Sequence, residues 1–181
     1  MTDEGKIARQ GSKSCNLYRD GLAESKRFRE EYPTRVQVMK AADMPFEDSP
    51  DGRIKHMIHR ELNTKECCID AYMQFIAPAK ASGRHRHLAE EVFYVIEGRG
   101  HDLHWDVRFD CKDEFVWEWE EEPRRYAWKK GDFVYIPPYS IHQHFNDEPK
   151  KEARIIVVTN RILKEMGFDW FDQLENAEGF E

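Results

Sequence analysis

The sequence from Gly83 to Gly100 reads G-R-H-R-H-L-A-E-E-V-F-Y-V-I-E-G-R-G, and it decides the fold that we expect. His85 and His87 lie two residues apart, and Glu91 follows four residues after His87. Successive side chains of a β-strand point to opposite faces, so positions 85, 87 and 91 share one face. Two imidazoles and a carboxylate are costly to bury inside a sheet unless they bind something. The stretch therefore predicts a site for a divalent metal ion.

Length and composition fit one globular domain with a substantial core, because the chain has 181 residues and 13% of them are aromatic. The net charge of −7 argues against nucleic acid or an anionic membrane as the main partner. No stretch approaches the roughly 20 apolar residues of a membrane span, and Met1–Gln10 lacks the apolar core of a secretory signal. The cysteines form no C-x-x-C pair, which favours a reducing, cytoplasmic location.

Patterns along the chain divide it into an extension, a barrel and a tail. Leu17–Glu31 reads as a short surface helix that Pro33 ends, so residues 1–34 are expected to be an N-terminal extension. Residues 35–160 are expected to form the barrel. Ile162–Leu174 has apolar residues at helical spacing, so residues 161–181 are predicted to be a C-terminal helix and tail packed on the barrel. The strands of the barrel are predicted at Arg35–Met39, Cys67–Ile76, Glu91–Ile96, His101–Val107, Tyr126–Trp128, Phe133–Ile136, Ile141–Phe145 and Arg154–Thr159, with a long hairpin or flap over Asp110–Arg125.

A second motif lies at Gly131–Asn146 and reads G-D-F-V-Y-I-P-P-Y-S-I-H-Q-H-F-N. Together the two segments fit the patterns H-x-H-x3-E-x6-G and G-x5-P-x3-4-H-x3-N, which resemble the paired motifs of the cupin superfamily. The resemblance covers roughly residues 67–160. Ala79 and Tyr139 stand at turn positions where that family usually has glycine. The residues that carry the match are His85, His87, Glu91 and Gly98 in the first motif, and Gly131, Pro137, His142 and Asn146 in the second.

The resemblance implies an all-β fold, a double-stranded β-helix or jelly-roll barrel, here with short N- and C-terminal helical extensions. It also implies that one divalent metal ion is bound by His85, His87, Glu91 and His142. Imidazole with one carboxylate suits Fe, Mn, Ni, Cu and Zn, of which Fe(II) is favoured here. Four protein ligands on an octahedral ion leave two positions for water, substrate or O₂. No cysteine is placed for a closed structural zinc site.

The other histidines have several interpretations. His144 shares the parity of His142 and is the candidate acid or base, although it also fits a substrate contact or a buried histidine with a partner. His101 shares its face with apolar neighbours and is expected in the core, whereas His104 is expected on the surface. No function is expected for His56 and His59.

Four further side chains have open roles. Gln74 and Tyr135 are candidates for the barrel mouth. Trp117 and Trp119 fit either an aromatic lid or a contact with another subunit, and the acidic run that follows reads as a solvated turn.

The function expected first is a dioxygenase that acts on a small oxygenated molecule, with O₂ as the second substrate. Pro137–Asn146 is similar to the P-P-x3-H-x-H-x-N run of gentisate-type ring-cleaving dioxygenases, although those enzymes generally lack the carboxylate of Glu91. The alternatives are a non-oxidative lyase, isomerase or decarboxylase that uses the ion as a Lewis acid, and a small-ligand-binding cupin without activity. A homodimer is expected.

Overall fold

The computed structural model describes residues 14–65, 68–111 and 115–180, and the chain divides into the units Met1–Arg35 and Val36–Glu181. The first unit contains the predicted helix α2, which spans Leu17–Glu31 and buries none of its residues. A single 3-10 turn, η1 (Tyr32–Thr34), follows and contains Pro33. Proline lacks the backbone N–H that a continuing helix would need, so α2 ends where the sequence predicts.

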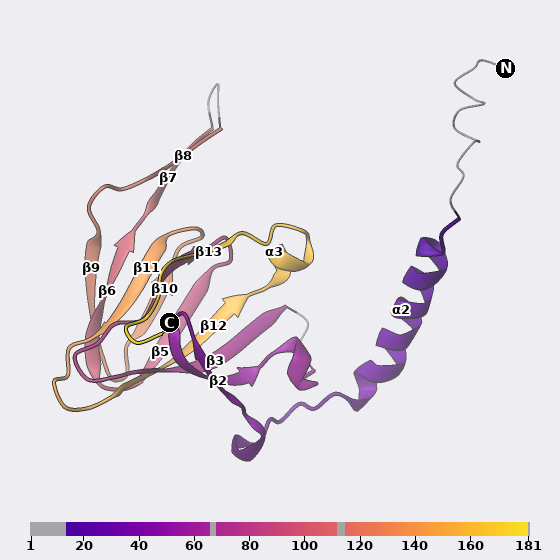
Figure 1. The fold of residues 1–181 in the computed structure, drawn as a ribbon, viewed down its shortest axis with the longest axis horizontal. Helices are drawn as coiled ribbons and strands as arrows, with labels where there is room; N and C mark the ends of the chain where they lie inside the picture. Colours follow the sequence, from indigo (N-terminus) through magenta and orange to yellow (C-terminus); the bar gives the residue numbers. More distant parts are fainter. Residues whose placement is uncertain (1–13, 66–67, 112–114, 181) are drawn as a thin grey trace. The chain divides into compact units, whose positions relative to one another are not determined.

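The second unit is built from antiparallel strands (Figure 1). Short helical segments are η2 (Ala41–Asp43), η3 (Arg60–Leu62) and α3 (Ile162–Glu165). The strands are β1 (Phe46–Ser49), β2 (Gly52–Ile58), β3 (Ile69–Ile76), β4 (Arg84–His87), β5 (Glu91–Glu97), β6 (Arg99–Trp105), β7 (Val107–Cys111), β8 (Phe115–Trp119), β9 (Arg124–Lys129), β10 (Phe133–Ile136), β11 (Ile141–Asn146), β12 (Ala153–Asn160) and β13 (Phe171–Glu175).

Two sheets form the layers of a jelly-roll barrel (Figure 1). The six-stranded sheet has the order β1-β2-β3-β12-β5-β10, and the five-stranded sheet has the order β13-β4-β11-β6-β9. Within the described residues, strands β7 and β8 pair only with each other and extend away from both sheets as a ribbon (Figure 1). This ribbon begins at Val107, earlier than the hairpin predicted over Asp110–Arg125, and β9 starts before the predicted span ends. Residues 112–114 lie outside the described residues. The all-β jelly-roll fold predicted from the sequence is confirmed.

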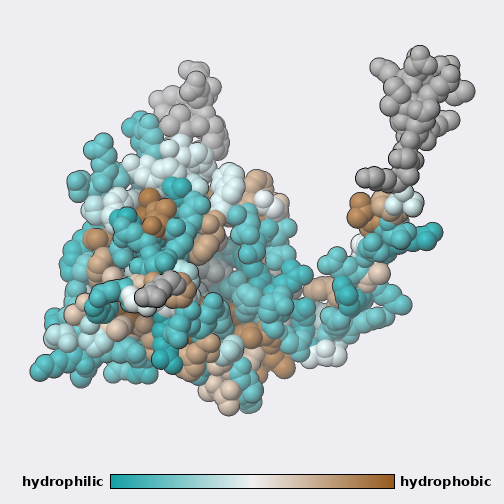
Figure 2. All heavy atoms as spheres, in the orientation of Figure 1, coloured by the Kyte–Doolittle hydropathy of each residue, from teal (hydrophilic) through white to brown (hydrophobic). Residues whose placement is uncertain are grey.

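The apolar core lies between the two sheets. Phe93 of β5 and Val157 of β12 pair directly and are fully buried, and Trp128 of β9 packs edge-on against Phe93. Burial of each large apolar side chain contributes about 1.5–3 kcal/mol. Tyr94 points the other way and is 41% exposed, so β5 is buried on one face rather than on both. The face of the molecule shown in Figure 2 is mainly hydrophilic, with hydrophobic residues scattered over it.

The structure corrects two predicted elements. Arg35–Met39 is not a strand, because Val36 makes only an isolated bridge to Thr64. The helix expected over Ile162–Leu174 ends at Glu165, and Gly167 follows it with a left-handed φ of 92°. Residues Phe171–Glu175 instead form β13, which pairs with the edge of β4. Strand pairing satisfies the free backbone groups of that edge, which an amphipathic helix would leave open.

Candidate metal centre

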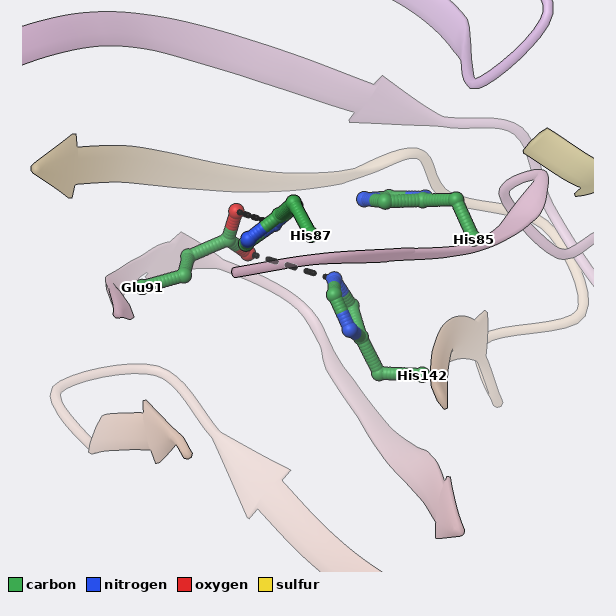
Figure 3. A group of neighbouring side chains, drawn as sticks. All are labelled: His85, His87, Glu91 and His142. Carbon is green, nitrogen blue, oxygen red and sulfur yellow. Dashed lines mark hydrogen bonds and ion pairs between the residues drawn. The ribbon is translucent and has the colours of Figure 1, made fainter. Parts of the chain in front are cut away.

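Three strands bring His85, His87, Glu91 and His142 together inside the barrel (Figure 3). His85 and His87 lie on β4, and His142 lies on β11 directly opposite His85. Glu91 is the first residue of β5, which belongs to the other sheet. Strand parity therefore predicted Glu91 correctly, but it assumed that Glu91 shares a strand with His85 and His87. The chain bends at 88–90 and crosses between the sheets, and this crossing turns the carboxylate toward the imidazoles.

The spacing of these four side chains fits one ion. One potential ligand atom from each lies within 4.8 Å of the others. Ligand atoms at about 2.0–2.2 Å from a common ion are at most about 4.4 Å apart, so the four side chains must move closer together to bind one ion. All four residues are buried, so this cluster of polar side chains is costly in free energy when no ion is bound to it.

Backbone carbonyls hold two of the imidazoles in the tautomer that a metal needs. Nδ1 of His87 donates to the carbonyl of Ala89 at 2.8 Å, and Nδ1 of His142 donates to the carbonyl of Ser140 at 2.9 Å. A carbonyl oxygen only accepts, so Nδ1 carries the proton and the Nε2 lone pair is available. Nε2 of His87 lies 3.2 Å from Oε2 of Glu91, and Nε2 of His142 lies 3.9 Å from Oε1 (Figure 3).

Several of the site's polar atoms have no hydrogen bond within the described part of the chain. They include Oε1 of Glu91 and Nε2 of His142, and both are inaccessible to solvent. Buried polar atoms are normally paired, because an unpaired one costs about 1–3 kcal/mol. A divalent ion would satisfy both, so the residues present fit such an ion.

Burial and neighbouring charges shift the pKa values of the side chains in the site. Burial lowers the pKa of His142 well below its usual value, and the neighbouring histidines lower it further, so this imidazole is neutral and ready to act as a ligand. Burial would raise the pKa of Glu91, but His87, His144 and His85 bring it below its usual value. Burial would lower the pKa of His87, yet its hydrogen bond to Glu91 and the charge of that carboxylate raise it.

A second polar layer lies behind Glu91. Oδ2 of Asp102 is 3.0 Å from Nδ1 of His144 and 3.2 Å from Nε2 of His104, and the indole of Trp128 donates to Oδ1 of Asp102 at 2.7 Å. Burial would lower the pKa of His144, but Asp102 and Glu91 raise it to about 9. Asp102 and Glu91 therefore favour the protonated form of His144, which lies between the two carboxylates.

The placement of β6 corrects the predictions for two histidines. His104 was expected on the surface but is only 2% exposed, because Gly100, Asp102 and His104 form the inner face of β6. His101 lies on the outer face, where Nδ1 is 2.9 Å from Asp147 and the ring stacks on Phe145, so it is not a core residue. The apolar neighbours of His101 suggested the wrong face, since the inner wall near the ligands is itself polar.

A cavity of about 630 Å³ opens onto the histidine and glutamate cluster. His85, His87 and Glu91 form its polar end, together with Asp51 and Tyr72, which the sequence did not single out. Neither has a motif that marks it, because each comes from a strand or turn outside the two histidine motifs. His142 and His144 are completely buried and are not among the cavity-lining residues.

The C-terminal segment supplies the apolar wall of this cavity. Phe171 of β13 pairs with His87 in register, and its ring stacks on the imidazole with an interplanar angle of 7°. Phe168 and Trp170 continue the wall. The wall exists because this segment is extended rather than helical.

The candidates Gln74, Tyr135, Trp117 and Trp119 do not line this cavity. Gln74 is buried and bonds to Asp51, whereas the hydroxyl of Tyr135 donates to the exposed Glu90 outside the barrel. Trp119 donates from Nε1 to the carbonyl of Tyr139, so the β7–β8 ribbon contacts the loop before β11. His56 and His59, for which no function was expected, do line the cavity.

Comparisons with known proteins agree with this architecture. A family model described as "Auxin binding protein" matches residues 34–173, and no curated protein sequence matches the chain significantly. A single-substitution variant of oxalate decarboxylase from Bacillus subtilis has a TM-score of 0.56 and 18% identity, with 77% of this chain and 33% of that chain covered. The iron(II) form of HppE has a TM-score of 0.50 and 15% identity, with 68% of this chain and 60% of that chain covered. The chain spans about a third of the length of the decarboxylase, and these likenesses concern the fold.

Proposed function

Because the chain belongs to the auxin binding protein family of the cupin superfamily, we propose that His85, His87, Glu91 and His142 bind one divalent ion and that the protein is a metal-dependent dioxygenase. Its substrate would be a small oxygenated aromatic or enolisable compound. The observation that carries the proposal is the convergence of these four buried side chains, three of which (His85, His87 and Glu91) line a cavity.

The donor set favours Fe(II), with Mn, Ni, Zn and Cu as alternatives. Two imidazoles with one carboxylate and open positions are typical of non-haem iron oxygenases, and His142 adds a third imidazole here. A bound Fe(II) would supply Lewis acidity and an electron for O₂.

The residues of the chain prepare the site for a chelating, electron-rich substrate. Glu91 supplies a negative charge that leaves the site of a divalent ion net positive, which favours an enolate or phenolate. Tyr72 lines the cavity beside Glu91 and Asp51, and burial followed by these carboxylates raises the pKa of its phenol. Its hydroxyl therefore stays protonated and is available to donate to a substrate oxygen.

His144 contributes to this chemistry through Glu91. It does not line the cavity, and its Nε2 is 3.7 Å from Oε1 of Glu91. A fixed imidazolium in this place limits the charge that Glu91 donates to an ion. We therefore propose His144 as a positioning residue for the carboxylate rather than as an acid or base in contact with substrate.

A small-ligand-binding protein without turnover is the second candidate. The aromatic wall of Phe168, Trp170 and Phe171 above the metal cluster favours it, because aromatic side chains bind flat apolar ligands without any reaction. The description of the family as a binding protein points the same way. Non-oxidative lyase, isomerase or decarboxylase chemistry would use the same cavity and ion.

Metal analysis of anaerobically purified protein, followed by oxygen uptake, separates these candidates. Protein loaded with Fe(II) is offered catechols, gentisate-like acids and β-diketones, and the dioxygenase proposal expects substrate-dependent uptake of O₂. Turnover without uptake supports the non-oxidative enzyme, and saturable binding of auxin or a related ligand without turnover supports the binding protein. Either of these two results contradicts the dioxygenase proposal. The control is His87→Ala, which removes a proposed ligand.

A further inference from the structure

Asp51 is an acidic residue beside the metal cluster that belongs to neither histidine motif. It lies in the turn between β1 and β2 and lines the cavity. Its Oδ1 atom is 3.3 Å from Nδ1 of His85, and both side chains are largely buried, with exposed fractions of 13% and 3%. The turn therefore brings a carboxylate to the back of one proposed ligand.

The Asp51 carboxylate is held in place from the opposite side. Nε2 of the buried Gln74 donates to Oδ2 of Asp51 at 2.7 Å and to its backbone carbonyl at 3.0 Å. The hydroxyl of Ser49 donates to the carbonyl of Gly52 at 2.8 Å and closes the turn. Oδ2 is thus occupied, and Oδ1 is the oxygen left to face His85.

His85 differs from the other two imidazoles of the cluster in what holds it. Nδ1 of His87 and Nδ1 of His142 each donate to a backbone carbonyl. Within the described residues, Nδ1 of His85 and Oδ1 of Asp51 are buried, and neither has an aligned hydrogen bond. The two atoms are 3.3 Å apart, so a hydrogen bond between them would pair two buried atoms at once.

We propose that Asp51 is the positioning residue for His85: its Oδ1 accepts the Nδ1 proton and so directs the Nε2 lone pair of His85 toward the ion. This inference rests on the proposed metal site and adds a residue outside the motifs to it. A carboxylate partner fixes the ring and raises the basicity of the imidazole, and loss of such a partner typically costs about 10- to 100-fold in metal affinity.

Zinc binding to metal-free protein tests the proposal without reference to any reaction. The affinity for Zn²⁺ alone is measured by competition with a chelator for wild type, Asp51→Ala and Asp51→Asn. Asp51→Ala should weaken zinc binding by about 10- to 100-fold. Asp51→Asn should lose less zinc affinity, because the amide oxygen of asparagine still accepts the Nδ1 proton of His85. Asp48→Ala removes an exposed carboxylate of the same hairpin and should leave the affinity unchanged.

A double-mutant cycle distinguishes an effect through His85 from a general structural effect. If Asp51 acts through this ring, adding Asp51→Ala to His85→Ala should weaken zinc binding no further. Additive losses, or an Asp51→Ala affinity within twofold of wild type, would overturn the proposal. Unfolding of the metal-free variants is followed by circular dichroism. If Asp51→Ala does not fold, the ¹⁵N tautomer signal of His85 in the metal-free wild type replaces it: the proposal expects the proton on Nδ1, and a proton on Nε2 alone overturns it.

The same titration separates this inference from the proposed function. A wild-type protein that binds no zinc at the cluster contradicts both. A wild-type protein that binds zinc while Asp51→Ala binds it equally well contradicts only the role of Asp51. Failure of oxygen uptake in a protein that shows the Asp51 effect contradicts only the dioxygenase.

Discussion

Nε2 of His144 lies 3.7 Å from Oε1 of Glu91, and the other ring nitrogen of His144 lies 3.0 Å from Asp102. The imidazole is therefore enclosed between two carboxylates and has no surface on the cavity. This relationship connects the polar interior of β6 with the proposed metal ligands. A substitution of His144 would therefore affect a bound substrate only through Glu91.

His144 should stabilise the metal-free protein in a pH-dependent way. Its pKa is raised to about 9 in the folded chain, against about 6.5 when unfolded. A raised pKa gives stability that is fully present below the unfolded value and is lost as pH rises through the folded value. The difference in Tm between wild type and His144→Gln should therefore narrow from about pH 6.5 to about pH 9. A constant difference across this range would contradict the protonated state.

Replacement of His87 by Ala should abolish stoichiometric metal binding. One of four ligands is lost, and the bond that holds Glu91 disappears with it. The metal content after dialysis measures this directly. His101→Ala is the matched control, because His101 lies on the outer face of the barrel. Full metal content in His87→Ala would disprove the site.

Metal affinity should fall as the pH falls. A ligating histidine must be neutral, and the pKa of His87 is raised by Glu91 despite burial. Competition between protons and the ion should therefore begin at a pH above about 6.5, the ordinary pKa of imidazole, and increase as the pH falls. Zinc affinity measured between about pH 5 and pH 8 checks this. A flat profile would be inconsistent with histidine ligands.

Phe93→Ala should destabilise the barrel by about 3–5 kcal/mol. Phe93 is fully buried, and its ring contacts both Trp128 and His144, so the substitution leaves a cavity between core and site. Phe133→Ala is the control, because Phe133 is 67% exposed. Urea unfolding of both variants measures the loss in the free energy of unfolding. Equal losses in the two variants would contradict the assignment of Phe93 to the core.

Ala79→Gly should stabilise the protein. Ala79 is exposed and has a φ of 54°, a left-handed conformation that costs a non-glycine residue about 1–2 kcal/mol. The greater freedom of glycine in the unfolded chain offsets about 0.4–1 kcal/mol of that gain, which leaves a net gain of about 0.5–1 kcal/mol. Ala81→Gly is the control and should destabilise the chain by a similar amount, since Ala81 has no left-handed φ. Thermal unfolding of the pair should show opposite shifts.

Local patterns in the sequence determined much of this protein. Strand alternation predicted most of the strands, and the resemblance of two motifs to the paired motifs of the cupin superfamily implied the barrel and the four clustered side chains. These were accessible from the sequence because residue types and spacings within a motif are local. The departures from glycine at Ala79 and Tyr139 also marked real turns, since both residues have a positive φ. Pro33 marked the end of α2 for an equally local reason.

Only the tertiary structure decided which side chains surround that cluster. The polarity of β6 could not show that Asp102 and His104 point inward, because an inner wall that supports polar ligands carries no apolar stripe. Nor could the spacing around Phe171 show that this residue forms a strand, since its partner β4 lies more than eighty residues earlier in the chain. Asp51 meets His85 for the same reason: the contact joins segments that are far apart in sequence, and only packing brings them together.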